Sequence, residues 1–199
     1  APSQIVAMSD GSLFTYELMN TRPVYTDPYT NQFLVAKSER EMLFIKSGAV
    51  VLFDRAAANT AGTPRTFQLQ MSGTPTISGN QLTFTAGGQR ADVWRLSPAN
   101  VPWTTAGVFS GTRAEAVHSS GTESLFLHII GVNNKVTSAV ADNTATETGT
   151  RITFNDGTVA TVRFSNAGRG GTLQIVNGSG VSQYNGALPT TVNSFPLYQ

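Results

Sequence analysis

Hydrophobic and polar residues alternate along most of the chain with a period of two, which is the pattern of a half-buried β-strand. A glutamine separates Phe67 from Leu69, and a threonine separates Leu82 from Phe84. Glycine-containing stretches lie between such runs, and glycine accepts the positive φ angles that tight hairpin turns require. We therefore predict three consecutive antiparallel strands over residues 66–96.

The second half of the chain repeats this arrangement. An Asn-Asp-Gly sequence at residues 155–157 separates two runs rich in β-branched residues, and Asp-Gly in that position is a strong hairpin signal. The stretch Gly168-Arg169-Gly170-Gly171 lacks the strand-to-helix context of a phosphate-binding loop and is predicted to be a flexible hairpin turn. The predicted strands of this half are residues 124–132, 135–141, 151–154, 159–164 and 173–176.

The pattern predicts an all-β fold without ordinary helices. Residues 38–45 begin with four polar residues but continue into a valine-rich run, so we interpret them as a strand rather than a helix. Turns recur at a spacing of about ten residues, which is typical of sheets that bury one face of each strand. We predict an antiparallel β-sandwich or stacked two-layer sheets, formed by residues 1–199 as a single domain.

Composition narrows the partners of such a domain. With 13 Lys and Arg against 12 Asp and Glu, the net charge of +1 predicts no nucleic-acid partner and no attraction to an anionic membrane. The longest apolar run, residues 48–53, is far shorter than the roughly 20 residues that span a bilayer. There is no cysteine, so disulfides and thiolate metal sites are excluded. The many Thr, Ser, Asn, Gln and Gly residues are typical of secreted β proteins that work on sugars.

An ordered set of short motifs adds a family resemblance. Residues 16–25 (YELMNTRPVY) precede a strand with Arg40, and a strand end VVLFDR follows at residues 50–55. Gly73-Thr74-Pro75 and Leu96-Ser97-Pro98 come later, and the apolar run at residues 125–130 extends the set. In this order the motifs resemble the C-terminal β-sheet region of the heparinase II/III-like polysaccharide lyases.

The resemblance implies a role without chemistry of its own. In that family most catalytic groups lie on an α/α-toroid that precedes the sheets, and this chain has no such helical region. We expect an accessory, noncatalytic domain of a secreted or periplasmic bacterial polysaccharide lyase, which binds an acidic polysaccharide and has a catalytic helical domain upstream. Either a signal peptide has been removed or the chain is part of a longer protein. Two alternatives stay open: a complete lyase acting by β-elimination, and a structural or assembly protein.

The adjacent charges of Asp54 and Arg55 stand where an apolar strand is expected to leave the core. Neighbouring residues of a strand point to opposite faces of the sheet, so one of the two can pair across strands while the other holds the loop at residues 56–65. The alternative is that Arg55 contacts a sugar directly.

Sugar binding needs exposed aromatic rings and donors for hydroxyls and carboxylates. The candidate rings include Tyr25 and Tyr29, because Pro28 forces a turn that can splay both outward, although each ring can equally cover the edge of the core. An arginine face is a further candidate for carboxylate recognition, formed by Arg40, Arg55, Arg90, Arg95 and Arg113. The carbohydrate-binding candidates are Tyr25, Tyr29, Trp94, Trp103, Arg55 and Arg95.

Catalytic and metal-binding candidates are few. A lyase would need a proton acceptor and donor, and the available pair is Tyr25 as base with His118 as its partner. His128 lies in an apolar strand and is predicted to be buried and hydrogen-bonded. Some members of the resembled family hold zinc through histidines and an aspartate, but Glu17 stands at the aspartate position here and has no histidine neighbour. We therefore expect no metal site and no cofactor.

Overall fold

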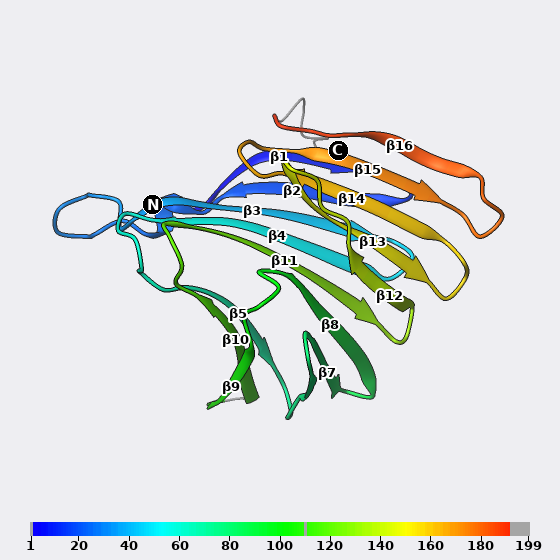
Figure 1. Ribbon diagram of the computed structural model, residues 1–199, viewed down its shortest axis with the longest axis horizontal. Helices are drawn as coiled ribbons and strands as arrows, with labels where there is room; N and C mark the ends of the chain where they lie inside the picture. Colours follow the sequence, from blue (N-terminus) through cyan, green and yellow to red (C-terminus); the bar gives the residue numbers. More distant parts are fainter. Residues whose placement is uncertain (1, 110, 192–199) are drawn as a thin grey trace, which may run out of the picture.

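The structure is a computed structural model that describes residues 2–109 and 111–191, and these form three antiparallel sheets (Figure 1). The largest, here called the central sheet, has eight strands. In spatial order they are β1 (Gln4–Asp10), β2 (Phe14–Asn20), β3 (Val35–Ile45), β4 (Ala49–Ala58), β11 (Glu123–Val132), β8 (Gln89–Ser97), β7 (Gln81–Ala86) and β6 (Thr76–Ser78). The prediction of an all-β, antiparallel fold is confirmed.

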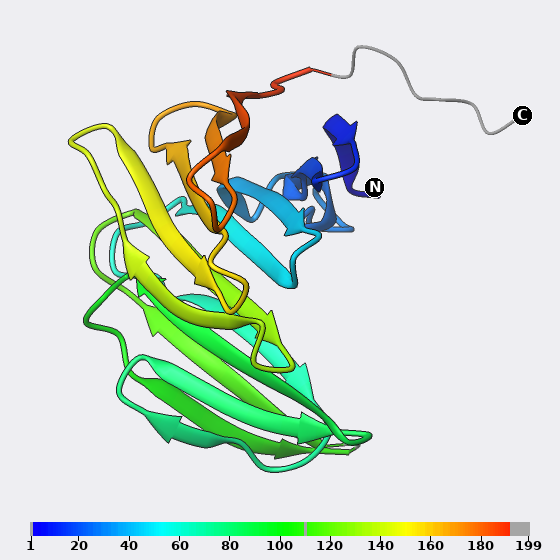
Figure 2. The same cartoon turned by 90° about the vertical axis from the view of Figure 1, so that its right-hand side faces the viewer.

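Two smaller sheets cover opposite faces of the central sheet (Figures 1 and 2). The large outer sheet consists of β12 (Val136–Ala141), β13 (Glu147–Phe154), β14 (Val159–Ser165), β15 (Gly171–Val176) and β16 (Ser182–Leu188). The small outer sheet consists of β5 (Arg65–Met71), β10 (Gly111–His118) and β9 (Trp103–Val108). Within the described chain, the helical structure is the three-residue 3-10 helix η1 (Arg22–Val24), and no helix is long and apolar enough to cross a bilayer.

Alternating residues of the central strands explain why the fold has two cores. In β4, Val51 and Phe53 point toward the large outer sheet, whereas Leu52 points toward the small one. Phe53 stacks on Phe164 of β14 with ring centroids 4.8 Å apart. The central sheet thus buries both of its faces, which is why runs such as β11 read as continuously apolar.

Most predicted strands and turns are confirmed, but one pairing is wrong. The Asn-Asp-Gly turn joins β13 to β14, and residues 38–45 belong to strand β3. Residues 66–96 do not form three consecutively paired strands, because β5 pairs with β10 while β6, β7 and β8 form their own hairpins. Phe67 and Met71 alternate as expected, yet they pack onto the central sheet from the opposite layer. Alternation predicts which face is buried but not which strand is the neighbour.

Candidate functional site

Two adjoining cavities of about 190 Å³ and 300 Å³ lie where β3 and β4 meet β5 and the segment that follows η1. Both are lined by Tyr25, Ser38, Ala56 and Thr66, so they form one continuous depression, here called the groove. Polar groups make up much of its walls. The groove is therefore a candidate site for a hydrophilic ligand.

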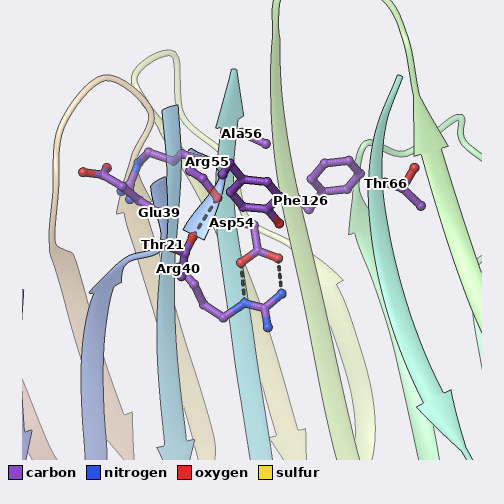
Figure 3. A pocket seen from close by; sticks show the side chains of 10 residues that line it. Thr21, Glu39, Arg40, Asp54, Arg55, Ala56, Thr66 and Phe126 are labelled. Atoms are coloured by element: carbon purple, nitrogen blue, oxygen red, sulfur yellow. Dashed lines mark hydrogen bonds and ion pairs between the residues drawn. The ribbon is translucent and has the colours of Figure 1, made fainter. Parts of the chain in front are cut away.

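An ion pair lies in the floor of the groove. Arg40 of β3 and Asp54 of β4 face each other in register, and the guanidinium donates two hydrogen bonds of 2.6 Å and 2.8 Å to the carboxylate (Figure 3). Hydrogen bonding to Asp54 raises the pKa of Arg40, and the side chain of Arg40 is still 38% exposed. Arg40 thus stays charged and keeps part of its surface open to a ligand.

Tyr25 forms one wall and is held by its backbone. Its N–H donates to the carbonyl of Arg22, and its own carbonyl accepts the N–H of Leu34, so the ring position is defined although the residue is 47% exposed. A half-exposed ring beside a guanidinium gives the groove an apolar surface and a cationic donor close together. Tyr29, the other candidate ring of this segment, is 94% exposed and does not line either cavity.

The opposite wall comes from the small outer sheet. Thr66 of β5 lines both cavities and Gln68 lines the larger one, and Figure 3 shows Thr66 on the strand beyond Phe126. The exposed charge of the groove is mainly cationic, which favours an anionic ligand. The side chains of Lys37 and Arg40 are 32% and 38% exposed, whereas those of their partners Glu39 and Asp54 are 9% and 15% exposed. Arg55 and Arg65 also border the cavities, but both are buried and already paired.

Arg65 anchors the loops behind this wall. It is buried, and every nitrogen of its guanidinium donates to a neighbour. The acceptors are Ser124 Oγ at 2.7 Å and the carbonyls of Thr63 at 2.6 Å, Gly121 at 3.2 Å, Ser120 at 2.6 Å and Glu123 at 3.3 Å. A planar fork of five donors suits this set of acceptors, and lysine has no equivalent geometry.

His118 belongs to the same network. Ser124 Oγ accepts the Nε–H of Arg65 and also shares a hydrogen bond with His118 Nδ1, which lies 2.7 Å away. Partial burial and the charge of Arg65 both lower the pKa of His118. The lowered pKa favours the neutral imidazole, and Nδ1 is already engaged with Ser124, so His118 is not placed as the charged proton donor that a lyase with Tyr25 as base would need.

The side chains of Asp54 and Arg55 do point to opposite faces, and Asp54 does pair across strands. β4 continues to Ala58, however, so the pair does not end the strand. Arg55 does not hold the following loop. It is 2% exposed, its Nη1 lies 2.5 Å from Glu41 Oε1, and it donates bonds of 2.9 Å and 2.7 Å to the carbonyl of Ser165 at the end of β14.

Glu41 is the centre of this buried cluster between the central and large outer sheets. Besides Arg55, it accepts the hydroxyl of Tyr16 at 2.5 Å and the N–H of Gly170 at 3.2 Å. Burial raises the pKa of Glu41, with Arg55 opposing it, and burial together with Glu41 raises the pKa of Tyr16 far above its usual range. Arg169 pairs with Glu39 at 2.7 Å, so the predicted glycine-rich turn is a hairpin tied to β3.

Two other candidate residues lie in the interior, and a third is partly buried. Trp103 is buried in the core under the small outer sheet, and its Nε1 donates to the carbonyl of Asn80 at 3.1 Å. Arg95 is buried with its guanidinium 5.5 Å from the Trp103 ring. Trp94 is not an outward-facing ring, because it packs against the core on the other face. Trp103 and Arg95 therefore offer no open surface to a sugar, and Trp94 is only partly exposed and lies outside the groove.

The five arginines do not form one face. Arg40 and Arg55 point to opposite faces of the central sheet, Arg95 is buried, and Arg113 of β10 pairs with Glu115 at 2.8 Å. Arg90 pairs with Asp92 of its own strand at 2.8 Å. Arg40 lies opposite Asp54 in register and shares its face of the sheet. Arg55 follows Asp54 along β4 and points to the other face, so Arg40 and Arg55 could not share a face.

His128 is buried, as predicted, but the expected hydrogen bond is wrong. Neither ring nitrogen has a hydrogen-bond partner in the described part of the chain. The imidazole instead stacks on Phe67, with ring centroids 3.6 Å apart and an interplanar angle of 14°. Metal ligation has no support here either, since no group of three or more His, Asp or Glu residues gathers among residues 2–109 and 111–191.

The sequence predicted Tyr25 as a binding residue and included Arg40 among the candidate arginines, but it did not predict the polar residues Ser38 and Thr66 that line the groove. Ser38 and Thr66 carry no chemical signal of their own, and the Arg40–Asp54 pair depends on strand register. That register was available in principle from the short turn between Ile45 and Ala49, which pair across it.

No family model matches the sequence, and no curated protein sequence matches it. Solved structures do match the fold. Heparinase III, the BT4657 gene product, gives a TM-score of 0.60 at 10% identity, covering 82% of this chain and 27% of that chain. The heparan sulfate lyase HepC from Pedobacter heparinus gives 0.53 at 12% identity, covering 97% and 29%, and a mutant of it gives 0.57 at 13% identity, covering 95% and 28%.

These matches confirm at the level of the fold the resemblance read from the sequence motifs. The chain spans less than a third of the length of each of those solved chains. What is shared is the arrangement of sheets, since the identities are between 10% and 13%.

Proposed function

We propose that this chain is an accessory, noncatalytic domain of a secreted polysaccharide lyase and binds an acidic polysaccharide in the groove. The observation that carries the proposal is the half-exposed ring of Tyr25 beside the partly exposed guanidinium of Arg40, in walls whose cations are more exposed than their carboxylates. A pyranose can pack its apolar face on the ring while its carboxylate or sulfate meets the guanidinium. The shared fold with part of two heparan-degrading enzymes supports this ligand class, and catalysis is assigned to a different segment.

The direct test is binding to heparin, hyaluronan and alginate by affinity electrophoresis, with dextran as an uncharged control. We expect retardation by at least one acidic glycan and none by dextran, with binding that weakens as salt is added. Absorbance of an unsaturated product formed by the purified chain would replace the proposal with a complete lyase. Absence of glycan binding together with micromolar self-association would replace it with an assembly role.

Replacing Tyr25 tests the aromatic wall. We expect Tyr25→Ala to weaken glycan binding about 5- to 10-fold, because a stacking surface worth about 1 kcal/mol is lost. Isothermal titration calorimetry measures the change. Tyr29→Ala is the matched control, since Tyr29 lies in the same segment but outside the groove, and its binding should stay within about twofold. If Tyr29→Ala is the more damaging change, the ligand binds at the tip of the segment instead.

Replacing Arg40 tests the cationic floor. Arg40→Gln should weaken binding about 10-fold or more, because charge-assisted hydrogen bonds contribute about 1.5–3 kcal/mol. The fold should survive, since a partly exposed ion pair is worth only about 0–1 kcal/mol. Arg113→Gln is the control, because Arg113 is 40% exposed in its side chain and ion-paired but lies outside the groove. Equal losses in both variants would mean that binding depends on general charge rather than on the groove.

A further inference from the structure

One wall of the groove is connected directly to the buried His128. Along β5, Thr66 and Gln68 line the groove, and between them Phe67 points the other way, into the core. The ring of Phe67 stacks on the imidazole of His128 in the core. A movement of the β5 backbone that withdraws Phe67 from His128 also moves the two groove residues on either side of it.

His128 is surrounded by cations and apolar groups. From β8, Arg95 lies opposite it in register, and from β3, Arg40 also acts on it electrostatically. Leu52 of β4 and the rings of Phe67 and Trp103 complete its surroundings. Asp54, the carboxylate of the neighbouring row, is already bound at both oxygens by Arg40.

A proton on this imidazole would have no acceptor among the described residues and would add a further positive charge beside two arginines. Burial, followed by the charges of Arg95 and Arg40, accordingly lowers the pKa of His128 well below its ordinary value. Burying an unpaired charge costs several kcal/mol. The charged imidazole is thus incompatible with the closed packing against Phe67.

The interface at His128 can separate without breaking a β-ladder. In the described chain, β5 pairs with β10 and β10 with β9, and none of the three pairs with a strand of the central sheet. Side-chain packing and the hydrogen bond from Trp103 Nε1 to the carbonyl of Asn80 hold the small outer sheet against the central sheet, while Arg65 ties its base to the loops at residues 63 and 120–123. The small outer sheet is therefore attached by side chains and loops rather than by a ladder, and its base is the most firmly fixed part.

We infer that His128 is an acid-sensitive lock on the groove: protonation of its imidazole releases Phe67, moves the wall that carries Thr66 and Gln68, and lowers the affinity for acidic glycan. The inference rests on the proposed function. It adds regulation to that site, so that ligand is held at neutral pH and released on acidification.

The size of the effect follows from proton linkage. In the open state His128 has an ordinary pKa of about 6.5, whereas in the closed state it stays neutral. A histidine with a lowered pKa when closed favours the closed state above about pH 6.5 and loses that contribution as the pH falls below it. The ratio of open to closed molecules then rises by up to about tenfold per pH unit, which gives about 30-fold from pH 7.5 to pH 5.0.

The test uses the two tryptophans of the chain separately. In a Trp94→Phe background, Trp103 is the single tryptophan and lies in the interface with the small outer sheet. Acrylamide quenching of Trp103 and the affinity for heparin, whose sulfates stay ionised, are measured from pH 7.5 to pH 5.0 at constant ionic strength. His128→Leu is compared with His118→Gln, which removes the other histidine of the chain.

We expect quenching to rise and heparin affinity to fall with acid in the parent and in His118→Gln, and both to stay flat in His128→Leu. If His128→Leu does not fold by circular dichroism, His128→Gln carries the same comparison. A quenching curve that is unchanged by removing His128, or that is flat in the parent, overturns the lock. If none of heparin, hyaluronan and alginate is bound at pH 7.5, the proposed function fails while the Trp103 curve still decides whether the lock exists.

Discussion

Arg55→Met is expected to lower the free energy of unfolding by about 3–5 kcal/mol, because it leaves the buried carboxylate of Glu41 without its counter-charge. It also removes both hydrogen bonds to the carbonyl of Ser165, which tie the central sheet to the large outer sheet. Urea denaturation followed by circular dichroism measures the loss. A loss below about 1 kcal/mol would show that the cluster is solvated or rearranged.

The pH dependence of this loss has a defined sign. Burial raises the pKa of Glu41 in the folded protein, and removing Arg55 raises it further. A carboxyl with a raised folded pKa contributes stability below its unfolded pKa of about 4.3 and loses it as the pH rises through the folded pKa. The difference between Arg55→Met and the parent should therefore be smaller at pH 5 than at pH 8.

A double variant separates the charge effect from packing. Glu41→Gln combined with Arg55→Met removes both charges, while the amide oxygen can still accept the Gly170 N–H and the amide NH2 can donate to the Tyr16 hydroxyl oxygen. We expect the double variant to be more stable than the sum of the two single changes by at least about 1 kcal/mol. Additive losses would mean that the pair is not energetically coupled.

Arg65→Met is expected to lower the free energy of unfolding by about 3–4 kcal/mol, since it strips donors from Ser124 Oγ and four backbone carbonyls at once. Arg65→Lys should lose at least half as much despite keeping the charge, because an ammonium cannot reproduce the planar fork. Thermal and urea unfolding provide the comparison.

The control for Arg65 comes from the same sheet. Arg113→Met removes a partly exposed arginine of β10 that pairs with Glu115, and should cost no more than about 1 kcal/mol. If Arg65→Lys is as stable as the parent, charge rather than donor geometry explains the role of Arg65. His118 offers a second readout, because losing the neighbouring charge of Arg65 should let its pKa rise.

The strands were predictable from local pattern because each buries one or both faces in a regular way. β3, β11 and the β13–β14 hairpin were read correctly from apolar runs and turn residues. The sheet to which β5 belongs was not predictable. Its apolar and polar residues alternate, and that pattern fits a strand of any sheet that buries one face. Its partner β10 begins 40 residues after β5 ends, and nothing in either strand specifies that long-range pairing.

The candidate site was less accessible than the fold for a similar reason. Tyr25 stood out because a ring beside a proline turn is a local feature. The burial of Trp103, Arg55 and Arg95 depends on what lies above each strand, and the sequence of one strand does not contain that information. The lack of a hydrogen-bond partner for His128 likewise depends on the side chains that β4, β8 and β5 place around it.

The independence of the small outer sheet from the ladders of the central sheet has a consequence for divergence among related domains. Substitutions in β5 can reshape the side of the groove that it contributes without disturbing the pairing of β3 with β4, which sets the floor. Under the proposed glycan-binding role, selection for a new ligand and selection for folding then act on different strands. A domain built in this way could change its ligand preference in small steps, each compatible with a folded protein.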